Sequence, residues 1–385
     1  MKLNVGVLFG GKTLEHELSI ITAIQAMNQI DTEKYEIIPI YIDKDLQMYT
    51  GGALRYIDTF KDYSLLKRYT KKVSIVNKDG RFVIQTNGLI KKEVNELHLA
   101  FPIMHGANAE DGSIQGFLNI LGIPYVGSSI YSSVLSQDKV FMKQVMKSNK
   151  IPVTDFVWFG ERFYRNKKEE LFKQIENLNY PLIIKPATLG SSIGIEVIKR
   201  KEELDSTIER VFKYDTKILI EEMIEDAIEY HCSVLLTQNG NITSEIEEIR
   251  TNKDVIEYGD KVFVNDENSD SSIKRKCPAN ISPALREEIE LNALATFKML
   301  NMRGTARVDF LYDSKNKKLY VDEINNIPWC FSHHLWETKN ITYKELLNIM
   351  LEDAKATEVN KQKMINNIEN DIIKNLTTTK IKEMK

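Results

Sequence analysis

Four side chains near the C-terminal end alternate along two strand-like segments, 305–312 and 319–325. They are a guanidinium, two carboxylates and an amide: Arg307, Asp309, Glu323 and Asn325. Residues two apart in a strand point to the same face, so pairing of the two segments through the polar turn between them would place all four on one wall. Such hard oxygens beside an arginine suit a Mg²⁺ ion that holds nucleotide phosphates, which points to an ATP-dependent enzyme.

A second candidate site begins at Lys185, which ends the apolar strand pattern 182–185. A loop of small residues follows, with Ser191 and Ser192 between two glycines. Unhindered backbone N–H groups and hydroxyls in such a loop can contact phosphate oxygens. The loop is not the GxxxxGK[ST] pattern, and considered alone a plain Gly/Ser turn accounts for it equally well.

Other charged residues lie beside apolar strand or helix patterns: Lys139, Glu221, Glu222 and Glu229. A single lysine or glutamate is most often a solvated surface charge. Taken together with the carboxylate strands and the small loop, these residues favour a nucleotide site.

The composition limits the classes of partner. The 385 residues are 42% hydrophobic and carry a formal net charge of −3, with lysines mixed among glutamates. This balance gives no concentration of positive charge that would attract nucleic acid or an anionic membrane, so small-molecule substrates are expected. No secretory region opens the sequence and no apolar stretch approaches the ~20 residues of a spanning helix, which predicts a cytoplasmic protein. Three distant cysteines are expected to be reduced thiols that form neither disulfides nor a metal site.

The element patterns predict an α/β protein of two or three domains. A βαβ opening is expected from strand 4–9, helix 18–30 and strand 35–42, and Asp79-Gly80 predicts a hairpin before a third parallel strand at 97–104. A small α+β unit follows from 139, and longer strands begin near 217. The polar segment 254–276 is either a functional loop or disordered. The polar tail is expected to form one docked helix with frayed residues after it.

Six ordered motifs resemble those of the D-alanine–D-alanine ligases of the ATP-grasp superfamily, over about residues 3 to 350. The motifs are GGKTLEHELS (10–19), HGANAEDGSIQG (105–116), GIPYVG (122–127), DK (138–139), KPATLGSSIG (185–194) and EIN (323–325). The resemblance implies an ATP-grasp fold in four parts. These are an N-terminal Rossmann-like, or pre-ATP-grasp, domain (1–138), a small α+β lid (139–220), a C-terminal α+β catalytic domain (221–357) and a helical polar tail (358–385).

The resemblance also implies a role for each nucleotide-site residue. Lys139, Lys185 and the loop at Ser192 would contact phosphates, and Lys261 would contact the γ-phosphate. Glu221 and the backbone near Glu222 and Ile224 would bind the adenine, and Glu229 would bind the ribose. Asp309, Glu323 and Asn325 would ligate Mg²⁺ or Mn²⁺, and Arg307 would stabilise the transferring phosphoryl group.

For the amino-acid substrates, Glu15 matches the residue that holds the ammonium of the first D-alanine. Ser191 matches a serine that hydrogen-bonds this glutamate, and His105 matches a histidine of the same pocket, although a structural histidine is an equal alternative. The implied reaction forms an acyl phosphate, which the amine of a second amino acid attacks in a site closed to water. The family also implies a homodimer.

The resemblance breaks on the acceptor side. In the segment NNIPWCFSHHL (325–335), Trp329 replaces a glycine and His334 a serine, while Leu335 is kept. His334 could still bind a carboxylate. Of the adjacent His333 and His334, one is expected to pack and the other to face solvent, rather than the two forming a metal pair. In the loop EYGDKVF (257–263), the family's tyrosine is replaced by Val262 or Phe263, a change that in related ligases accompanies use of D-lactate or D-serine.

Three hypotheses follow. The leading one is joining of D-alanine to D-alanine for peptidoglycan precursors. The second is a ligase with another acceptor, such as D-serine, D-lactate or the substrate of a specialised pathway. The third is a catalytically silent nucleotide-binding paralogue, against which the full set of metal ligands beside Arg307 argues.

Overall fold

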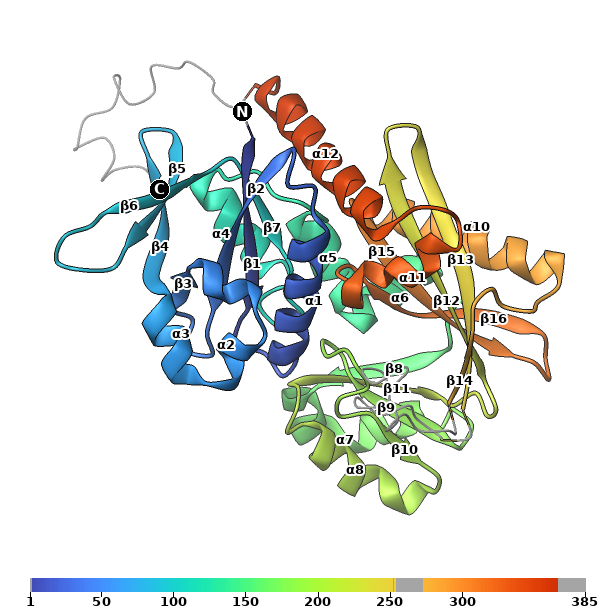
Figure 1. The fold of residues 1–385 in the computed structure, drawn as a ribbon. Helices are drawn as coiled ribbons and strands as arrows, with labels where there is room; N and C mark the ends of the chain where they lie inside the picture. Colours follow the sequence, from blue (N-terminus) through green and yellow to red (C-terminus); the bar gives the residue numbers. More distant parts are fainter. Residues whose placement is uncertain (1, 252, 254–272, 366–385) are drawn as a thin grey trace, which may run out of the picture.

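The computed structural model describes residues 2–251, 253 and 273–365 and arranges them around separate β-sheets (Figure 1). An N-terminal sheet, a lid sheet and a C-terminal sheet can be followed along the chain. The mixture of parallel and antiparallel strands with helices confirms the α/β class.

The N-terminal sheet has the strand order β6-β5-β4-β3-β2-β1-β7. Its strands are β1 (Leu3–Gly10), β2 (Tyr35–Ile42), β3 (Met48–Thr50), β4 (Lys71–Lys78), β5 (Arg81–Thr86), β6 (Glu93–Leu97) and β7 (Leu99–Pro102). β1 lies parallel to both β2 and β7, which confirms the βαβ opening and places the third parallel strand at 99–102. Asp79 and Gly80 have φ of 53° and 83°, as a tight hairpin turn between β4 and β5 requires.

Helices cover both faces of this sheet. They are α1 (His16–Gln29), η1 (Gly52–Arg55), α2 (Asp58–Lys61), α3 (Tyr63–Tyr69) and α4 (Ser113–Leu121). The next helix, α5 (Ile130–Gln137), packs against the C-terminal part of the chain, where Ser132 Oγ donates to the carbonyl of Asn301 at 2.9 Å. Val5 and Val7 pack in one core with α1, whereas Leu8 packs in another with α4. Burial on both faces explains why β1 reads as a continuous apolar run rather than an alternating one.

The lid sheet is antiparallel, in the order β10-β9-β11-β8. Its strands are β8 (Phe156–Gly160), β9 (Leu182–Pro186), β10 (Glu196–Ile198) and β11 (Lys217–Glu222), and its helical elements are α7 (Glu161–Ile175), η2 (Lys201–Glu203) and α8 (Leu204–Val211). The preceding helix, α6 (Lys139–Ser148), packs Met142 and Met146 into the core of the C-terminal sheet. Apolar residues of α7 and α8 pack on one face of the sheet. β11 crosses the boundary expected between residues 220 and 221, so Glu221 and Glu222 belong to the lid sheet.

The C-terminal sheet has the order β14-β13-β12-β15-β16. Its strands are β12 (Ile228–Thr237), β13 (Gly240–Arg250), β14 (Lys274–Lys276), β15 (Thr305–Asp313) and β16 (Lys318–Asn325), and its helical elements are α10 (Pro283–Met299), η3 (Trp329–Ser332), α11 (His333–Glu337) and α12 (Tyr343–Gln362). The expected functional loop lies almost wholly outside the described residues, as does most of the predicted tail.

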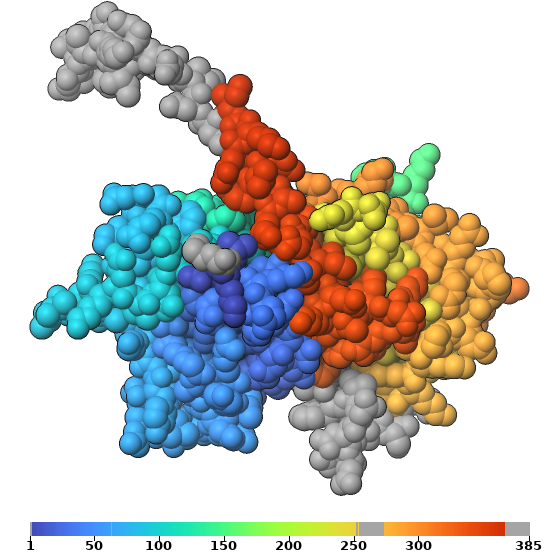
Figure 2. Space-filling view, turned by 45° about the horizontal axis from the view of Figure 1, so that its top comes forward, coloured from blue at the N-terminus to red at the C-terminus, as the bar shows by residue number. Residues whose placement is uncertain are grey.

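Helix α12 packs against the N-terminal helix α1, although the two lie far apart in the sequence. α12 begins at Tyr343 and so runs across the boundary expected at residues 357 and 358. Leu346 and Met350 of α12 share a core with α1. Figure 2 shows the red segment that contains α11 and α12 between the blue N-terminal region and the orange C-terminal region. This packing fixes α1, and with it Glu15, relative to the C-terminal sheet.

The cysteines are free thiols, as the sequence predicts. Burial raises the pKa of Cys232 and of Cys330 to about 12. Among the helices of the described residues, none combines the length and the apolar character that crossing a bilayer demands.

Candidate active site

The wall predicted from alternate positions is present on β15 and β16. The strands pair antiparallel, with Arg307 opposite Asn325 and Asp309 opposite Glu323. Arg307 donates from Nε and Nη2 to the two oxygens of Asp309 at 2.6 and 2.7 Å, and Asn325 Nδ2 donates to Asp309 Oδ2 at 2.9 Å. The guanidinium and the carboxylate therefore form a two-point, charge-assisted pair inside the protein.

Lys139 joins this wall from the first turn of α6. Asp138 caps the helix by accepting from the backbone N–H groups of Val140 and Phe141, which sets the direction of the first turn. Lys139 Nζ lies 3.2 Å from Glu323 Oε2 and donates to the Leu189 carbonyl at 2.8 Å. A lysine at the carboxylate wall is suited to bind a phosphate oxygen there.

The donor set fits a magnesium ion. Asp309, Glu323 and Asn325 offer carboxylate and amide oxygens from neighbouring strands, the ligand type that Mg²⁺ prefers. The anionic oxygens are held in place by the cationic groups of Arg307 and Lys139. These three residues would hold the metal, which would supply positive charge at the wall.

A cavity of about 350 Å³ lies between the lid sheet and β16. Glu323 lines this cavity. So do six of the residues assigned to the nucleotide, which are Lys185, Ser192, Glu221, Glu222, Ile224 and Glu229. Lys139 is not among its lining residues but reaches the same wall through Glu323. Lys261 lies outside the described residues.

A buried ion cluster forms one side of this cavity. Lys185 Nζ lies 2.6 Å from Glu221 Oε1 and 2.7 Å from Asp322 Oδ1, and Lys143 Nζ lies 2.8 Å from Glu221 Oε2. Burial disfavours the charged form of Lys185, but Asp322 and Glu221 outweigh it and raise its pKa. Burial likewise opposes ionisation of Glu221, yet Lys143 and Lys185 lower its pKa. Both Lys185 and Glu221 are therefore held in their charged forms.

Two members of this cluster, Lys143 and Asp322, were missed by the sequence analysis. Strict alternation along β16 places Asp322 on the face opposite Glu323, but the register shifts beside this point, so that Asp309 pairs with Glu323 and Phe310 with Val321. The irregularity leaves Asp322 as an extra residue that turns toward Lys185. Lys143 had a readable signal, because it lies four residues after Lys139 on the same face of α6.

A second cavity, of about 620 Å³, adjoins the first. Glu15, His105, Ser191, Trp329 and His334 line it, together with Arg307 and Asn325 of the wall. Leu335 is fully buried and does not line this cavity. Glu229 and Ile249 line both cavities, so the two spaces meet beside the wall.

Glu15 forms the end of the second cavity nearest α1. Ser191 Oγ donates to Glu15 Oε1, which brings the small loop of the lid onto the N-terminal domain. Burial, and then the nearby Glu110, raise the pKa of Glu15. A Cβ on Gly106, whose φ is 76°, would lie 2.7 Å from Glu15 Oε2, so the close approach of this loop requires glycine.

His105 is 3% exposed and has partners inside the protein. Its Nε2 lies 2.9 Å from Thr22 Oγ1, and its Nδ1 lies 3.6 Å from Glu110 Oε1. His105 therefore combines the two alternatives left open by the sequence, because it is anchored structurally and also lines the cavity. Glu110, in the same motif, also lines the second cavity, although the sequence did not single it out.

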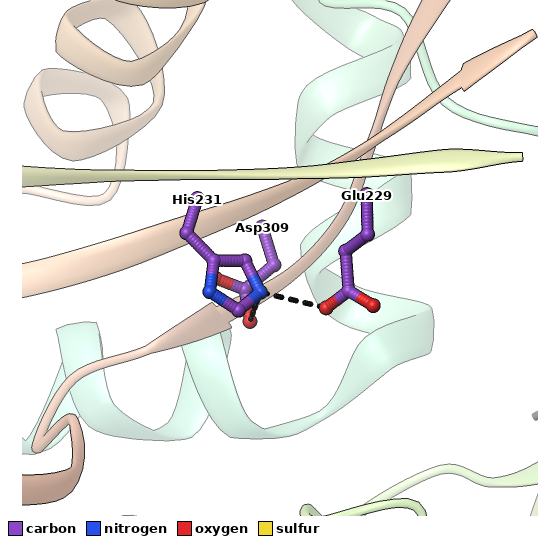
Figure 3. Close-up of side chains that lie close together, drawn as sticks. All are labelled: Glu229, His231 and Asp309. Atoms are coloured by element: carbon purple, nitrogen blue, oxygen red, sulfur yellow. Dashed lines mark hydrogen bonds and ion pairs between the residues drawn. The ribbon is translucent and has the colours of Figure 1, made fainter. Parts of the chain in front are cut away.

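His231 is a site residue that the sequence analysis missed. Its Nε2 lies 2.6 Å from Glu229 Oε1 and 3.7 Å from Asp309 Oδ2, and its Nδ1 lies 3.3 Å from Glu247 Oε2 (Figure 3). Three possible ligand atoms lie within 4.8 Å of one another, one each from Glu229, His231 and Asp309. This arrangement could also accept a metal ion. Its position two residues after Glu229 on one strand was a usable signal.

Register explains how these charges line up. Glu247 of β13 pairs with His231 of β12, which pairs with Asp309 of β15, which pairs with Glu323 of β16. One row of ionisable residues thus crosses neighbouring strands of the C-terminal sheet. Burial lowers the pKa of His231, but Asp309, Glu229 and Glu247 together outweigh burial and raise the pKa.

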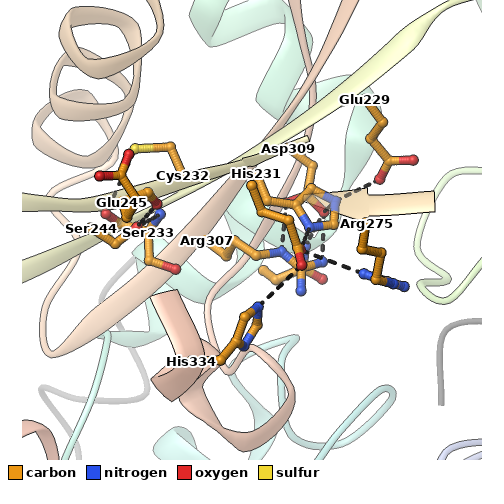
Figure 4. Close-up of polar contacts among 12 residues, drawn as sticks. Glu229, His231, Cys232, Ser233, Ser244, Glu245, Arg275, Arg307, Asp309 and His334 are labelled. Carbon is orange, nitrogen blue, oxygen red and sulfur yellow. Dashed lines mark hydrogen bonds and ion pairs between the residues drawn. The ribbon is translucent and has the colours of Figure 1, made fainter. Parts of the chain in front are cut away.

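Segment 325–335, in which the family pattern breaks, contacts this row of ionisable residues through His334. Its Nε2 lies 3.4 Å from Glu247 Oε1, and Arg275 Nη1 lies 3.5 Å from Glu247 Oε2. Figure 4 shows His231, Arg275 and His334 near Arg307 and Asp309. His333 instead stacks on Tyr343 with ring centroids 4.5 Å apart, so the expected divergence of the two histidines is confirmed.

The backbone before α11 has an unusual conformation. Cys330, Phe331 and Ser332 have φ of 48°, 52° and 50°. Non-glycine residues rarely adopt this left-handed region, which costs about 1–2 kcal/mol each. The strain falls in the segment where the family pattern has glycine, beside the cavity-lining Trp329.

Replacing Ser332 with glycine is expected to raise the free energy of unfolding by about 1 kcal/mol, because glycine adopts this φ freely. The Ser332 hydroxyl is buried without a hydrogen-bond partner in the described structure, so its loss should cost little. Ser332→Ala is the matched control, since it removes the hydroxyl but keeps Cβ. Urea unfolding of both variants measures the difference, and equal stability of the two would contradict a backbone origin.

Comparisons with known proteins agree with this geometry. The family model for the D-ala D-ala ligase N-terminus matches residues 4–128, and the model for the D-ala D-ala ligase C-terminus matches residues 145–352. The D-alanine–D-alanine ligase of Thermosipho africanus is 39% identical over 96% of this chain and 98% of its own length. That of Clostridium acetobutylicum is 36% identical over 92% of this chain and 98% of its own length.

Solved structures give the same result. The D-alanine–D-alanine ligase of Coxiella burnetii has a TM-score of 0.80 and 28% identity, covering 94% of this chain and 96% of its own. The VanG D-Ala:D-Ser ligase of Enterococcus faecalis has a TM-score of 0.77 and 28% identity, covering 92% and 100%. These likenesses confirm the ATP-grasp fold. The chain therefore belongs to the D-alanine–D-alanine ligase family of ATP-dependent ligases that form a carbon–nitrogen bond.

Proposed function

We propose that this chain uses ATP and Mg²⁺ to join D-alanine to D-alanine for peptidoglycan precursors. The observation that carries the proposal is the meeting of two cavities beside the wall of Arg307 and Asp309. A phosphoryl group bound in the first cavity can thus reach a carboxylate bound in the second. The names of the relatives, which match nearly their full length, supply the substrates.

The residues divide the reaction between them. Glu15 binds the ammonium of the first D-alanine and directs its carboxylate toward Arg307. Lys139 and Lys185 hold the phosphates, and Arg307 stabilises negative charge on the transferring phosphoryl group and then on the tetrahedral intermediate. Bound Mg²⁺, or Mn²⁺, held by Asp309, Glu323 and Asn325 would neutralise phosphate charge. Ser191 closes the lid loop onto Glu15, which excludes water from the acyl phosphate.

A second acceptor, D-serine, is supported by two observations. One side of the second cavity is lined by Trp329 and His334, and His334 Nε2 lies 3.4 Å from Glu247 Oε1. The VanG ligase, whose fold is similar, acts on D-Ala and D-Ser. Replacement of the family's glycine by Trp329 reshapes this side of the cavity.

Phosphate release separates these possibilities. The purified protein should release phosphate from Mg·ATP with D-alanine, and mass spectrometry should identify D-alanyl-D-alanine. Reactions with D-alanine plus D-serine or D-lactate test the other acceptors. Absence of phosphate release with every D-amino acid would refute the ligase function and favour a silent paralogue.

We further propose a cytoplasmic homodimer, in line with the substrates and with the family. Light scattering coupled to size-exclusion chromatography measures the mass in solution. A mass near 44.4 kDa would correspond to one chain and contradict the dimer.

A further inference from the structure

Lys143 has no role in the reaction described above, yet it is one of the most buried charges of the chain. Its side chain is 0% exposed, on the face of α6 that also carries Lys139. Nζ donates to Thr154 Oγ1 at 2.9 Å and lies 2.8 Å from Glu221 Oε2, and the Thr154 hydroxyl donates to the same carboxylate oxygen. A lysine is buried to this degree only when it is tightly paired.

Lys143 approaches Glu221 from behind the nucleotide cavity. Thr154, Lys185 and Glu221 line that cavity, whereas Lys143 does not. Lys143 is therefore positioned to act on a nucleotide through Glu221 rather than by contact.

A bound nucleotide would change the contact of Glu221 with Lys185 but not its contact with Lys143. Lys185 lines the cavity and contacts both Glu221 and Asp322. When Lys185 moves to a phosphate, as the proposed function requires, its contact with Glu221 is weakened. Lys143 lies behind the cavity and keeps its contact, so it remains the counter-ion of a carboxylate that is only 1% exposed.

The charge of Glu221 decides which base it can accept. An ionised carboxylate only accepts hydrogen bonds, so it matches the 6-amino group of adenine and opposes a 6-oxo group. A protonated carboxyl can donate to a 6-oxo group instead. A buried carboxylate without a counter-ion takes up a proton more readily.

We propose that Lys143 is a positioning residue that acts through Glu221: it fixes an ionised carboxylate against the 6-amino group and makes the enzyme select ATP over 6-oxo purine nucleotides. This inference rests on the proposed placement of adenine at Glu221. It adds a specificity-determining residue outside the nucleotide cavity.

The test compares ATP with ITP, which carries a 6-oxo group. The readout is the ratio of kcat/KM for the two nucleotides, with D-alanine saturating, in the full chain. Lys143→Met is expected to lower the ATP:ITP ratio by about 10- to 100-fold, mainly through KM for ATP, and Lys143→Arg to restore most of it. Lys147→Met is the matched control, because Lys147 lies one turn further along α6 in an exposed pair with Asp155 and should leave the ratio unchanged.

A double variant keeps the test decisive if Lys143→Met does not fold. Lys143→Met combined with Glu221→Gln removes both buried charges, and it should discriminate no less than Glu221→Gln alone. A further loss in the double variant, or an unchanged ratio in folded Lys143→Met, overturns the inference. An unchanged ratio in Glu221→Gln would instead show that the proposed adenine position is wrong.

Discussion

Replacing Asp309 with asparagine is expected to lower kcat by about 10²- to 10³-fold, measured as phosphate release from Mg·ATP with D-alanine. Asp309 binds Arg307 through both oxygens and is 2% exposed. Asparagine has one carbonyl oxygen and no charge, so it would leave the buried guanidinium without its counter-ion and weaken the proposed metal site. The effect should fall on kcat more than on KM for D-alanine.

Asp313→Asn is the control for this change. Asp313 lies four residues further along the same strand and accepts hydrogen bonds from the turn after it, away from the wall. It should retain wild-type kcat. Near-normal turnover in Asp309→Asn would show that the wall does not support phosphoryl transfer.

Replacing Glu15 with glutamine should lower kcat/KM for the first D-alanine by about 10²-fold while KM for ATP stays unchanged. Glutamine keeps the size and hydrogen-bonding oxygen of the side chain but removes the charge that attracts the ammonium. Glu17→Gln, an exposed neighbour in the first turn of α1, is the matched control. An equal loss in both variants would indicate damage to the helix rather than loss of substrate binding.

The same residue predicts a pH dependence. Burial, followed by Glu110, raises the pKa of Glu15, so its ionised fraction grows as pH rises through that raised value. Wild-type affinity for the first D-alanine should therefore increase with pH across this range, whereas Glu15→Gln should lack the change. A profile of KM against pH for both proteins measures it, and parallel profiles would assign the titration to another group.

Local patterns predicted the parts of the molecule that depend on short-range geometry. The period of two along β15 and β16 was sufficient to place Arg307, Asp309, Glu323 and Asn325 on one wall. The Asp-Gly turn was readable for the same reason. These features depend on residues close together in the sequence.

Residues that depend on long-range register were not predicted. Asp322 reaches the nucleotide cavity because of an irregularity in strand pairing, which a period of two cannot reveal. Glu247 joins the site because β13 pairs with β12 opposite His231, and nothing in its neighbouring residues indicates that pairing. α12 runs across the boundary expected at residues 357 and 358 because its apolar residues pack on α1, far away in the sequence. The helix expected in the tail lies mostly outside the described residues.

Lys185 and Lys139, the lysines assigned to the phosphates, are already matched with Asp322 and Glu323 before any nucleotide binds. With the proposed roles, arrival of ATP would exchange one set of ionic partners for another, and the net attraction would be the difference between the two sets. The same carboxylates would be available to the lysines again as ADP departs. The strong attraction that recruits the triphosphate would then not trap the spent nucleotide.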